Sequence, residues 1–192
     1  LTGEIPPEIG SVTNLDILAL SYNQLTGEIP ESIFNLEHLT NLDLSANAYL
    51  GGSITNLSNL LNLEYFTIWD CNFSGPIPES IGQMTSLKRL NLAYNQFTGE
   101  IPESIVNLTN ITFLNFASNL LEGPIPEDIG TLENLTDFFS VWSNNLSGSL
   151  PPSIFNLTNL NILELSYNHF SGSIPEDICN LNSESLHDST EI

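Results

Sequence analysis

A short motif that recurs along the whole chain constrains the fold more than any other feature of this sequence. The hexapeptide LTGEIP at 1–6 returns at 25–30, variants of it begin at 73, 97, 121, 146 and 170, and a degraded copy, LGGSIT, occupies 50–55. Successive copies start 23 to 25 residues apart. Self-similarity at a fixed period of roughly 20 to 50 residues indicates a stack of similar coils. We therefore expect one solenoid built from units of about 24 residues.

A second pattern, L-x-x-L-x-L-x-x-N, lies between the copies of the first. Its central L-x-L alternates inward and outward residues, which is the periodicity of a β-strand. We expect the inward pairs to stack into the core: Leu18/Leu20, Leu42/Leu44, Phe66/Ile68, Leu90/Leu92, Leu114/Phe116, Phe139/Val141 and Leu163/Leu165. The closing Asn predicts an internal ladder of amides that satisfy backbone groups. Its members are Asn23, Asn47, Asn95, Asn119, Asn144 and Asn168.

The two motifs together resemble the leucine-rich repeat family, and specifically its plant-type extracellular subclass, whose mark is L-x-G-x-I-P after the Asn. The resemblance implies an α/β solenoid: a right-handed leucine-rich-repeat superhelix with a parallel β-sheet on its concave face and short 3-10 segments on its convex face. We expect the solenoid to cover 1–181 as about eight units of 24 residues, the first and last incomplete. Residues 182–192 place polar side chains where apolar ones belong, which predicts a polar C-terminal tail.

The charge of the chain excludes several classes of partner. It carries 23 acidic residues and only two basic ones, for a formal net charge of −21. Nucleic acids require basic residues that displace counterions from phosphates, so we expect no nucleic-acid binding. No apolar run approaches the ~20 residues of a membrane span, so we expect no membrane insertion in this chain. The three histidines, His38, His169 and His187, have no metal-ligand spacing, and we expect neither an enzyme, a cofactor nor a metal.

The two cysteines, Cys71 and Cys179, lie about four and a half repeats apart. At ~4.8 Å per coil their separation exceeds about 20 Å, beyond the ~7 Å between Cα atoms that a disulfide tolerates. We therefore expect both thiols to be unbridged within the chain. Cys71 stands at an Asn-ladder position, where we expect it to be buried. Cys179 occupies a position where other units have Gly82 or Gly130, and it is either a buried thiol or half of a bridge to a cap.

Seven N-x-S/T sequons occur in the chain. The repeat's own N-L-T-N-L stretch generates such triplets without any need for glycans. The family resemblance nevertheless implies an extracellular protein, secreted or at the cell surface, in which sequons are acceptors for N-linked glycan. We therefore expect a glycoprotein. The candidate sites are Asn56, Asn72, Asn107, Asn110, Asn134, Asn145 and Asn156.

The outward positions of the predicted concave strands hold both tryptophans, four of the five tyrosines and the only two basic residues. Exposed aromatic side chains on a sheet indicate a partner, and Trp, Tyr and Arg dominate binding hot spots. Lys88 and Arg89 either receive an acidic group of a ligand or neutralise neighbours such as Glu64 and Asp70. The candidate ligand-binding residues are Tyr65, Trp69, Lys88, Arg89, Tyr94, Phe113, Phe138, Trp142 and Tyr167.

Two functions fit these observations. The first is an extracellular recognition module, of the plant receptor-kinase ectodomain or polygalacturonase-inhibitor type, that binds a peptide, protein or glycan ligand on its concave face. The alternative is a structural or self-associating extracellular fibre or surface-coat glycoprotein, in which solenoid ends stack on one another. An ice-binding role would require flat rows of identical small polar residues. In this chain Trp69 and Trp142 interrupt the row that contains Ser21, Ser45 and Ser166.

Overall fold

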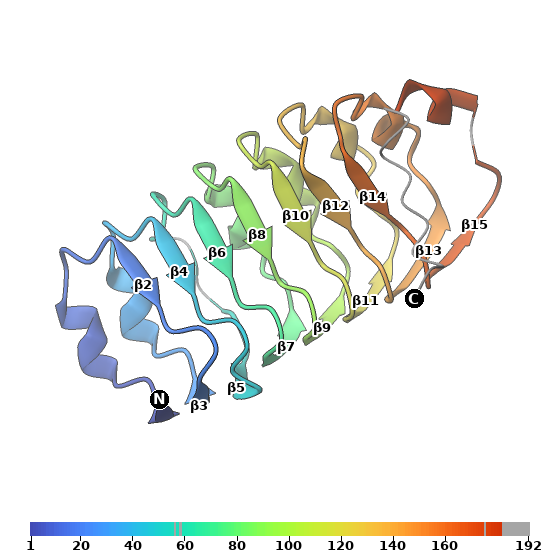
Figure 1. Ribbon diagram of the computed structural model, residues 1–192. Coiled ribbons are helices and arrows are strands. Elements are labelled where there is room, and N and C mark those ends of the chain that lie inside the picture. The colour runs from blue at the N-terminus through green and yellow to red at the C-terminus, as the bar shows by residue number, and fades with distance from the viewer. Residues whose placement is uncertain (56, 58, 175, 182–192) are drawn as a thin grey trace.

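A computed structural model describes residues 1–55, 57, 59–174 and 176–181. The predicted polar tail at 182–192 and the sequon at Asn56 lie outside these described residues. The described residues form a single row of stacked coils (Figure 1). Most coils consist of a strand, a turn, a second strand and a 3-10 helix, but the described residues between 52 and 65 include no 3-10 helix.

The L-x-L segments form a seven-stranded parallel sheet in the order β14-β12-β10-β8-β6-β4-β2. In every strand the middle residue is buried, as the alternation predicts. This confirms the predicted parallel sheet, whose solvent side we call the concave face. Its strands are β2 (Ile17–Ala19), β4 (Asn41–Asp43), β6 (Tyr65–Thr67), β8 (Arg89–Asn91), β10 (Phe113–Asn115), β12 (Phe138–Ser140) and β14 (Ile162–Glu164).

The L-x-G segments form a second parallel sheet of eight strands, which we did not predict from the sequence. The glycine of this motif bends the chain, because it has a positive φ that other residues rarely adopt: Gly27 has φ +77 and Gly148 φ +82. These glycines and their neighbours nevertheless pair from coil to coil, Gly27 with Leu50 and Gly148 with Phe170. The strands are β1 (Thr2–Glu4), β3 (Gln24–Glu28), β5 (Tyr49–Gly52), β7 (Asn72–Pro76), β9 (Gln96–Gly99), β11 (Leu120–Gly123), β13 (Asn145–Ser149) and β15 (His169–Ser171).

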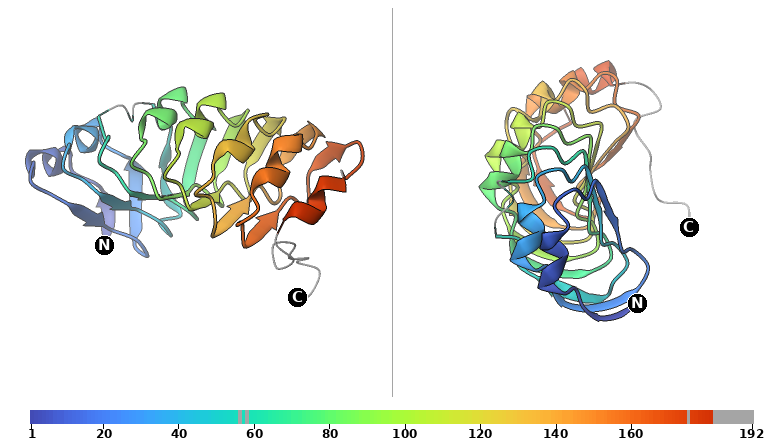
Figure 2. Two further views of the ribbon diagram at one scale, coloured as in Figure 1. Left: turned by 90° about the horizontal axis from the view of Figure 1, so that it is seen from above. Right: turned by 90° about the vertical axis from the view of Figure 1, so that its left-hand side faces the viewer.

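Short 3-10 helices lie along the side of the solenoid opposite the concave face (Figures 1 and 2). Most begin directly after the Pro of I-P or L-P, whose extended backbone sets the entry angle, as at Pro30 and Pro102. Seen end-on, the helices lie along one outer edge of the stacked coils (Figure 2, right). They are η1 (Pro7–Ser11), η2 (Glu31–Asn35), η3 (Glu79–Gln83), η4 (Glu103–Asn107), η5 (Ile129–Thr131), η6 (Pro152–Asn156) and η7 (Glu176–Asn180).

The ladder amides join neighbouring coils as predicted. The Nδ2 group of Asn119 donates to the carbonyls of Phe116 in its own coil and Leu92 in the preceding one, each at 3.0 Å. Its Oδ1 atom accepts a hydrogen bond from the backbone N–H of Phe97, also at 3.0 Å. Because each buried amide satisfies groups from two coils, the ladder couples the coils to one another.

Cys71 interrupts this ladder without leaving a backbone N–H unpaired. The preceding coil has one extra residue, and the N–H of Leu50 donates to the carbonyl of Asn47 at 2.9 Å instead of to a ladder side chain. The Cys71 thiol donates to the carbonyl of Leu44 at 3.4 Å. Burial raises the pKa of this thiol to about 11. Both cysteines are free; Cys71 is half-buried and Cys179 is exposed, so the buried-thiol interpretation of Cys179 is wrong.

Candidate functional site

The parallel register aligns outward side chains of successive strands in rows across the concave face. Arg89 pairs with Tyr65 on one side and with Phe113 on the other. Phe138 follows Phe113 in the same row. Because neighbouring strands lie only ~4.8 Å apart, side chains in one row touch.

Arg89, Phe113 and Phe138 form a continuous stack. The Arg89 guanidinium carbon lies 3.8 Å from the centroid of the Phe113 ring. The rings of Phe113 and Phe138 are stacked, with centroids 5.0 Å apart and an interplanar angle of 15°. Cation–π and aromatic stacking contacts each contribute about 0.5–1.5 kcal/mol. The stack therefore holds the guanidinium in one orientation on the sheet surface.

Lys88 has a different environment from Arg89. Its Nζ atom lies 2.7 Å from a carboxylate oxygen of Glu64, in the preceding coil. The hydrogen bond from Lys88 to Glu64, helped by the attraction between their charges, raises the pKa of Lys88. Lys88 thus neutralises Glu64, one of the two roles we considered for it. In the part of the chain that the structure describes, Arg89 forms no ion pair.

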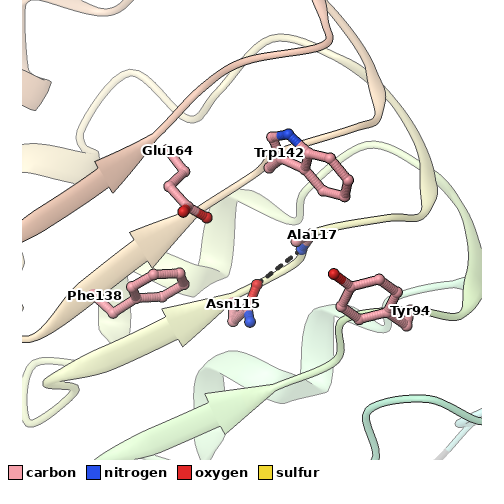
Figure 3. Close-up of a pocket in the computed structure, with 6 residues that line it drawn as sticks. All are labelled: Tyr94, Asn115, Ala117, Phe138, Trp142 and Glu164. Atoms are coloured by element: carbon pink, nitrogen blue, oxygen red, sulfur yellow. Dashed lines mark hydrogen bonds between the residues drawn. The ribbon is translucent and has the colours of Figure 1, made fainter. Parts of the chain in front are cut away.

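A hollow of about 270 Å³ opens on the concave face between the fourth and seventh strands of the sheet (Figure 3). Three aromatic residues stand around it: Tyr94, Phe138 and Trp142. Asn115 and Ala117 also line it, and the Asn115 side chain is fixed because its Oδ1 accepts the N–H of Ala117 at 3.0 Å. Glu164 on β14 supplies the one charged group of the lining.

The hollow arises from a difference in side-chain size within one row. Trp142 has the small residue Ala117 as its neighbour in the preceding coil, and Ala93 holds the same position in the coil before that. Both alanines are buried, with Ala93 1% and Ala117 5% exposed. A large side chain beside two small ones leaves a recess in an otherwise flat sheet.

The structure brings part of the predicted ligand-binding set together. Tyr94, Phe138 and Trp142 line the hollow. Phe113 stacks on Phe138 outside the hollow, and Arg89 lies over Phe113. Tyr167 packs edge-on against Trp142, with ring centroids 5.6 Å apart. These six residues, with Asn115, Ala117 and Glu164, form what we call the aromatic site. Asn115, Ala117 and Glu164 were missing from our candidates, although the row register signals their position.

The remaining predicted residues lie elsewhere on the concave face. Trp69 packs edge-on against Tyr22, two coils away, with centroids 5.7 Å apart. Tyr22 was absent from the candidate set, and the small side chain of Ala46 between the two explains how they meet. Tyr65 lies beside Arg89 in the sheet register, and Lys88 is engaged with Glu64.

Three tyrosines of the concave face have a left-handed backbone conformation. Tyr22, Tyr94 and Tyr167 have φ between 54 and 57, a region that non-glycine residues rarely adopt. Residues of other types at the equivalent position, such as Ala46 and Ser118, have the same conformation. The strain therefore belongs to the turn that leads into each ladder position and is no mark of function.

The described sequons differ in how their amides are engaged. The Nδ2 groups of Asn110 and Asn134 donate to carbonyls of the preceding coil, at 2.9 and 2.7 Å. Asn72 accepts a hydrogen bond from the side chain of Gln96. All six of these asparagines are exposed, but within the described residues the side chains of Asn107, Asn145 and Asn156 form no hydrogen bond. These last three are therefore the most accessible acceptors for glycan.

A second hollow, of about 450 Å³, lies away from the concave face between two I-P turns and is lined by Glu79, Glu100 and Glu103. Its residues are the repeated framework of the chain, so nothing distinguishes it from other coils. Among the described residues no group of three or more potential ligands is placed to hold a metal ion. None of the described helices has the length and apolar character needed to cross a membrane.

Coils that combine one inward L-x-L strand, one ladder amide and one 3-10 turn define the class of leucine-rich-repeat solenoids. The chain belongs to the leucine-rich repeat family: residues 48–182 match the family model described as leucine-rich repeat region, and residues 14–36 match the leucine-rich repeat model. A comparison with curated protein sequences gave no match.

Solved plant receptor structures are similar along almost the whole chain. The plant peptide hormone receptor RGFR1, in complex with RGF2, is 42% identical with a TM-score of 0.90 over 94% of this chain and 29% of its own. The Arabidopsis receptor kinase HAESA, in complex with the peptide hormone IDA and the co-receptor SERK1, is 38% identical with a TM-score of 0.92 over 96% and 31%. The chain thus spans less than a third of these receptor chains.

A plant ice-binding protein is also similar, at 26% identity and a TM-score of 0.64, over 91% of this chain and 71% of its own. These likenesses confirm the leucine-rich-repeat solenoid with parallel strands and 3-10 turns. The receptor structures place the chain among proteins that resemble the leucine-rich-repeat ectodomains of plant receptor kinases. Such ectodomain-like modules are repeat scaffolds, typically without catalytic activity.

Proposed function

We propose that this chain is an extracellular recognition module that binds an extended peptide across its concave face, with the aromatic site as the main contact. The observation that carries the proposal is the hollow itself, in which Tyr94, Phe138 and Trp142 converge. Aromatic residues at the centre of a recessed surface are the usual anchors of an interface. The likeness to two receptors solved with peptide hormones adds support.

The physics of the concave face suits an extended ligand. The strands form one rigid parallel sheet, so a peptide that lies across them meets a new coil every ~4.8 Å. The side chains it meets differ from coil to coil, which provides selectivity. Because the stack of Arg89, Phe113 and Phe138 is already ordered, binding costs little side-chain entropy there.

We also propose that the protein is secreted or displayed outside the cell and carries N-linked glycan. Asn107 and Asn156 end helices on the side opposite the concave face, and Asn145 begins β13 in the second sheet. Glycans at these positions leave the aromatic site uncovered. An ice-binding function has less support, because the concave row that holds Ser21, Ser45 and Ser166 also contains two tryptophans.

A peptide selection tests the binding proposal. The protein, expressed through a eukaryotic secretory pathway, is immobilised and presented with a phage library of random 12-residue peptides. We expect enrichment of a peptide family by the native protein and a loss of roughly 30-fold in affinity for Phe138→Ala or Trp142→Ala, the size of a hot-spot contact.

Tyr49→Ala is the matched control for this selection. Tyr49 is 72% exposed but lies on β5, in the second sheet. We expect peptides selected on the native protein to bind this variant unchanged. A selection that enriches nothing, or peptides that lose as much affinity with Tyr49→Ala as with Trp142→Ala, would contradict the proposed function.

A further inference from the structure

We propose that the hollow of the aromatic site is a subsite for one basic side chain, Lys or Arg, of the bound peptide. The aromatic rings of Tyr94, Phe138 and Trp142 surround the cation, and the carboxylate of Glu164 is its counter-charge. This inference rests on the proposed function, since it names the chemistry of one position in the peptide ligand.

The placement of the polar groups is the first argument. Figure 3 shows the carboxylate of Glu164 and the hydroxyl of Tyr94 directed toward the space between the rings, with Asn115 below them. The Oδ1 atom of Asn115 already accepts the N–H of Ala117. Glu164 is half-buried, and within the described residues it forms no ion pair. Among the residues that the structure describes, this half-buried carboxylate therefore has no cationic partner.

The charge of Glu164 decides between possible occupants. An apolar side chain fits aromatic walls, but it removes water from an unpaired carboxylate, which is unfavourable. An acidic side chain meets direct repulsion. A guanidinium or ammonium group is attracted both by the carboxylate and by the electron-rich faces of aromatic rings. Of these three classes, only a basic side chain satisfies both parts of the lining.

The size of the hollow limits the occupant to one side chain. Its volume of about 270 Å³ falls below the roughly 300–1,000 Å³ of pockets that hold drug-sized molecules. The formal charge of −21 also favours the approach of a cationic group. Arg89, the nearby cation, lies at the far end of the stack, with Phe113 between it and Phe138. It therefore does not occupy the subsite.

The experiment uses small probes that carry a single side chain. Trp69→Phe leaves Trp142 as the only tryptophan, so its fluorescence reports occupancy of the hollow. The probes are the N-acetyl methylamides of arginine and lysine, with those of citrulline and norleucine as neutral counterparts. Because the probes are N-acetylated, their only cation is the side chain, which separates side-chain recognition from capture of a peptide amino terminus.

We expect the arginine and lysine probes to change the fluorescence saturably in the millimolar range, and the neutral probes to bind at least tenfold more weakly. In the Trp69→Phe background, Glu164→Gln should weaken the basic probes about tenfold, as loss of a charged hydrogen bond requires. Glu122→Gln is the matched control, because Glu122 is exposed on β11 and should leave binding unchanged. Equal binding of arginine and citrulline probes, or full binding by Glu164→Gln, overturns the subsite.

The peptide selection separates this inference from the proposed function. We expect selected peptides to share a basic residue, and selection on Glu164→Gln to lose that preference while peptides still bind. Peptides without a shared basic residue, or an unchanged preference on Glu164→Gln, refute the subsite and leave peptide recognition standing. Saturable binding of the basic probes without any enriched peptide refutes peptide recognition and leaves the subsite standing.

Discussion

The interior and the concave face of this solenoid are built from the same strands but follow opposite rules. Inside, almost every coil repeats the same side chains, and Phe116 and Asn119 differ little from their counterparts in neighbouring coils. Outside, one row runs from Tyr65 through Arg89 and two Phe to Ile162. Repetition is what a stack of coils needs, because each buried side chain must fit the next coil. Variation along a row allows a ligand to contact a different side chain at each coil and so to be distinguished from other ligands.

The irregular coil before Cys71 shows what fixes the residue type at an interior position. Cys71 replaces a ladder Asn where the preceding coil has one extra residue and the N–H of Leu50 finds a partner within its own turn. The ladder therefore tolerates a change where the backbone no longer needs the amide oxygen. Interior positions are fixed by the hydrogen bonds they must satisfy, whereas concave positions such as Phe113 are free of that demand.

Two phenylalanines three residues apart give the largest expected contrast. Phe116 is 0% exposed, and Phe116→Ala should lower the free energy of unfolding by about 3–5 kcal/mol, since it leaves a cavity. Phe113→Ala removes a surface stack and should cost about 1 kcal/mol. Urea unfolding of both variants measures the difference. Equal losses would mean that the concave aromatics belong to the core.

Substitutions in the Asn ladder should give the second-largest difference in stability. Asn119→Ala leaves the N–H of Phe97 and the carbonyl of Leu92 without their side-chain partner, and should cost about 2–3 kcal/mol. Cys71→Ala removes only weak thiol hydrogen bonds and should cost about 1 kcal/mol or less. The same unfolding experiment applies. A Cys71→Ala variant as damaged as Asn119→Ala would contradict the tolerance we infer for that coil.

We expect Asp43, on the concave sheet, to make a smaller contribution to stability that depends on pH. Burial raises the pKa of Asp43, but hydrogen bonds from Ser45, Thr67 and Ser21 outweigh it, and the pKa lies below the usual 3.8. A lowered pKa in the folded state stabilises the protein above pH 3.8, and this contribution disappears as the pH falls through the folded value.

Asp43→Asn should therefore reduce the loss of stability in this acidic range and lower the stability at pH 7. Thr67→Val, which removes the hydroxyl that donates to Asp43 at 2.8 Å, should have part of the same effect. Thermal unfolding from pH 7 down to about pH 2, well below the usual pKa of an Asp, provides the measurement. Identical pH profiles for the native protein and Asp43→Asn would exclude a role for this carboxylate in acid stability.

The sequence was sufficient to predict the solenoid, the seven parallel strands and the ladder, because each follows from a motif that repeats. It also placed Tyr94, Phe138 and Trp142 on one face. It did not predict the second sheet, since L-x-G is too short for a strand pattern to be recognised. Nor did it predict that Trp69 meets Tyr22 across an intervening coil, or that Glu164 faces the hollow. Those contacts depend on side-chain sizes in neighbouring coils.

Lys88 and Arg89 provide the last and smallest test of the difference between interior and surface. Lys88→Ala should leave the stability unchanged within experimental error, because its pair with Glu64 lies in solvent. Arg89→Ala should cost about 0.5–1 kcal/mol of stability through its contact with Phe113. Arg89 is nevertheless the cation left without a carboxylate in the part of the chain that the structure describes. It should therefore be the one that receives an acidic group of a peptide ligand.

For a selected peptide that contains an acidic residue, Arg89→Ala should weaken binding by about 1.5–3 kcal/mol, the value of a charged hydrogen bond. The dependence of binding on salt should fall as well, since one charge pair is lost. Lys88→Ala should change neither. Titrations at two salt concentrations with both variants decide the question. If Arg89→Ala binds normally and only melts earlier, the guanidinium serves to hold the aromatic stack, and both cations belong to the architecture of the surface rather than to its ligand.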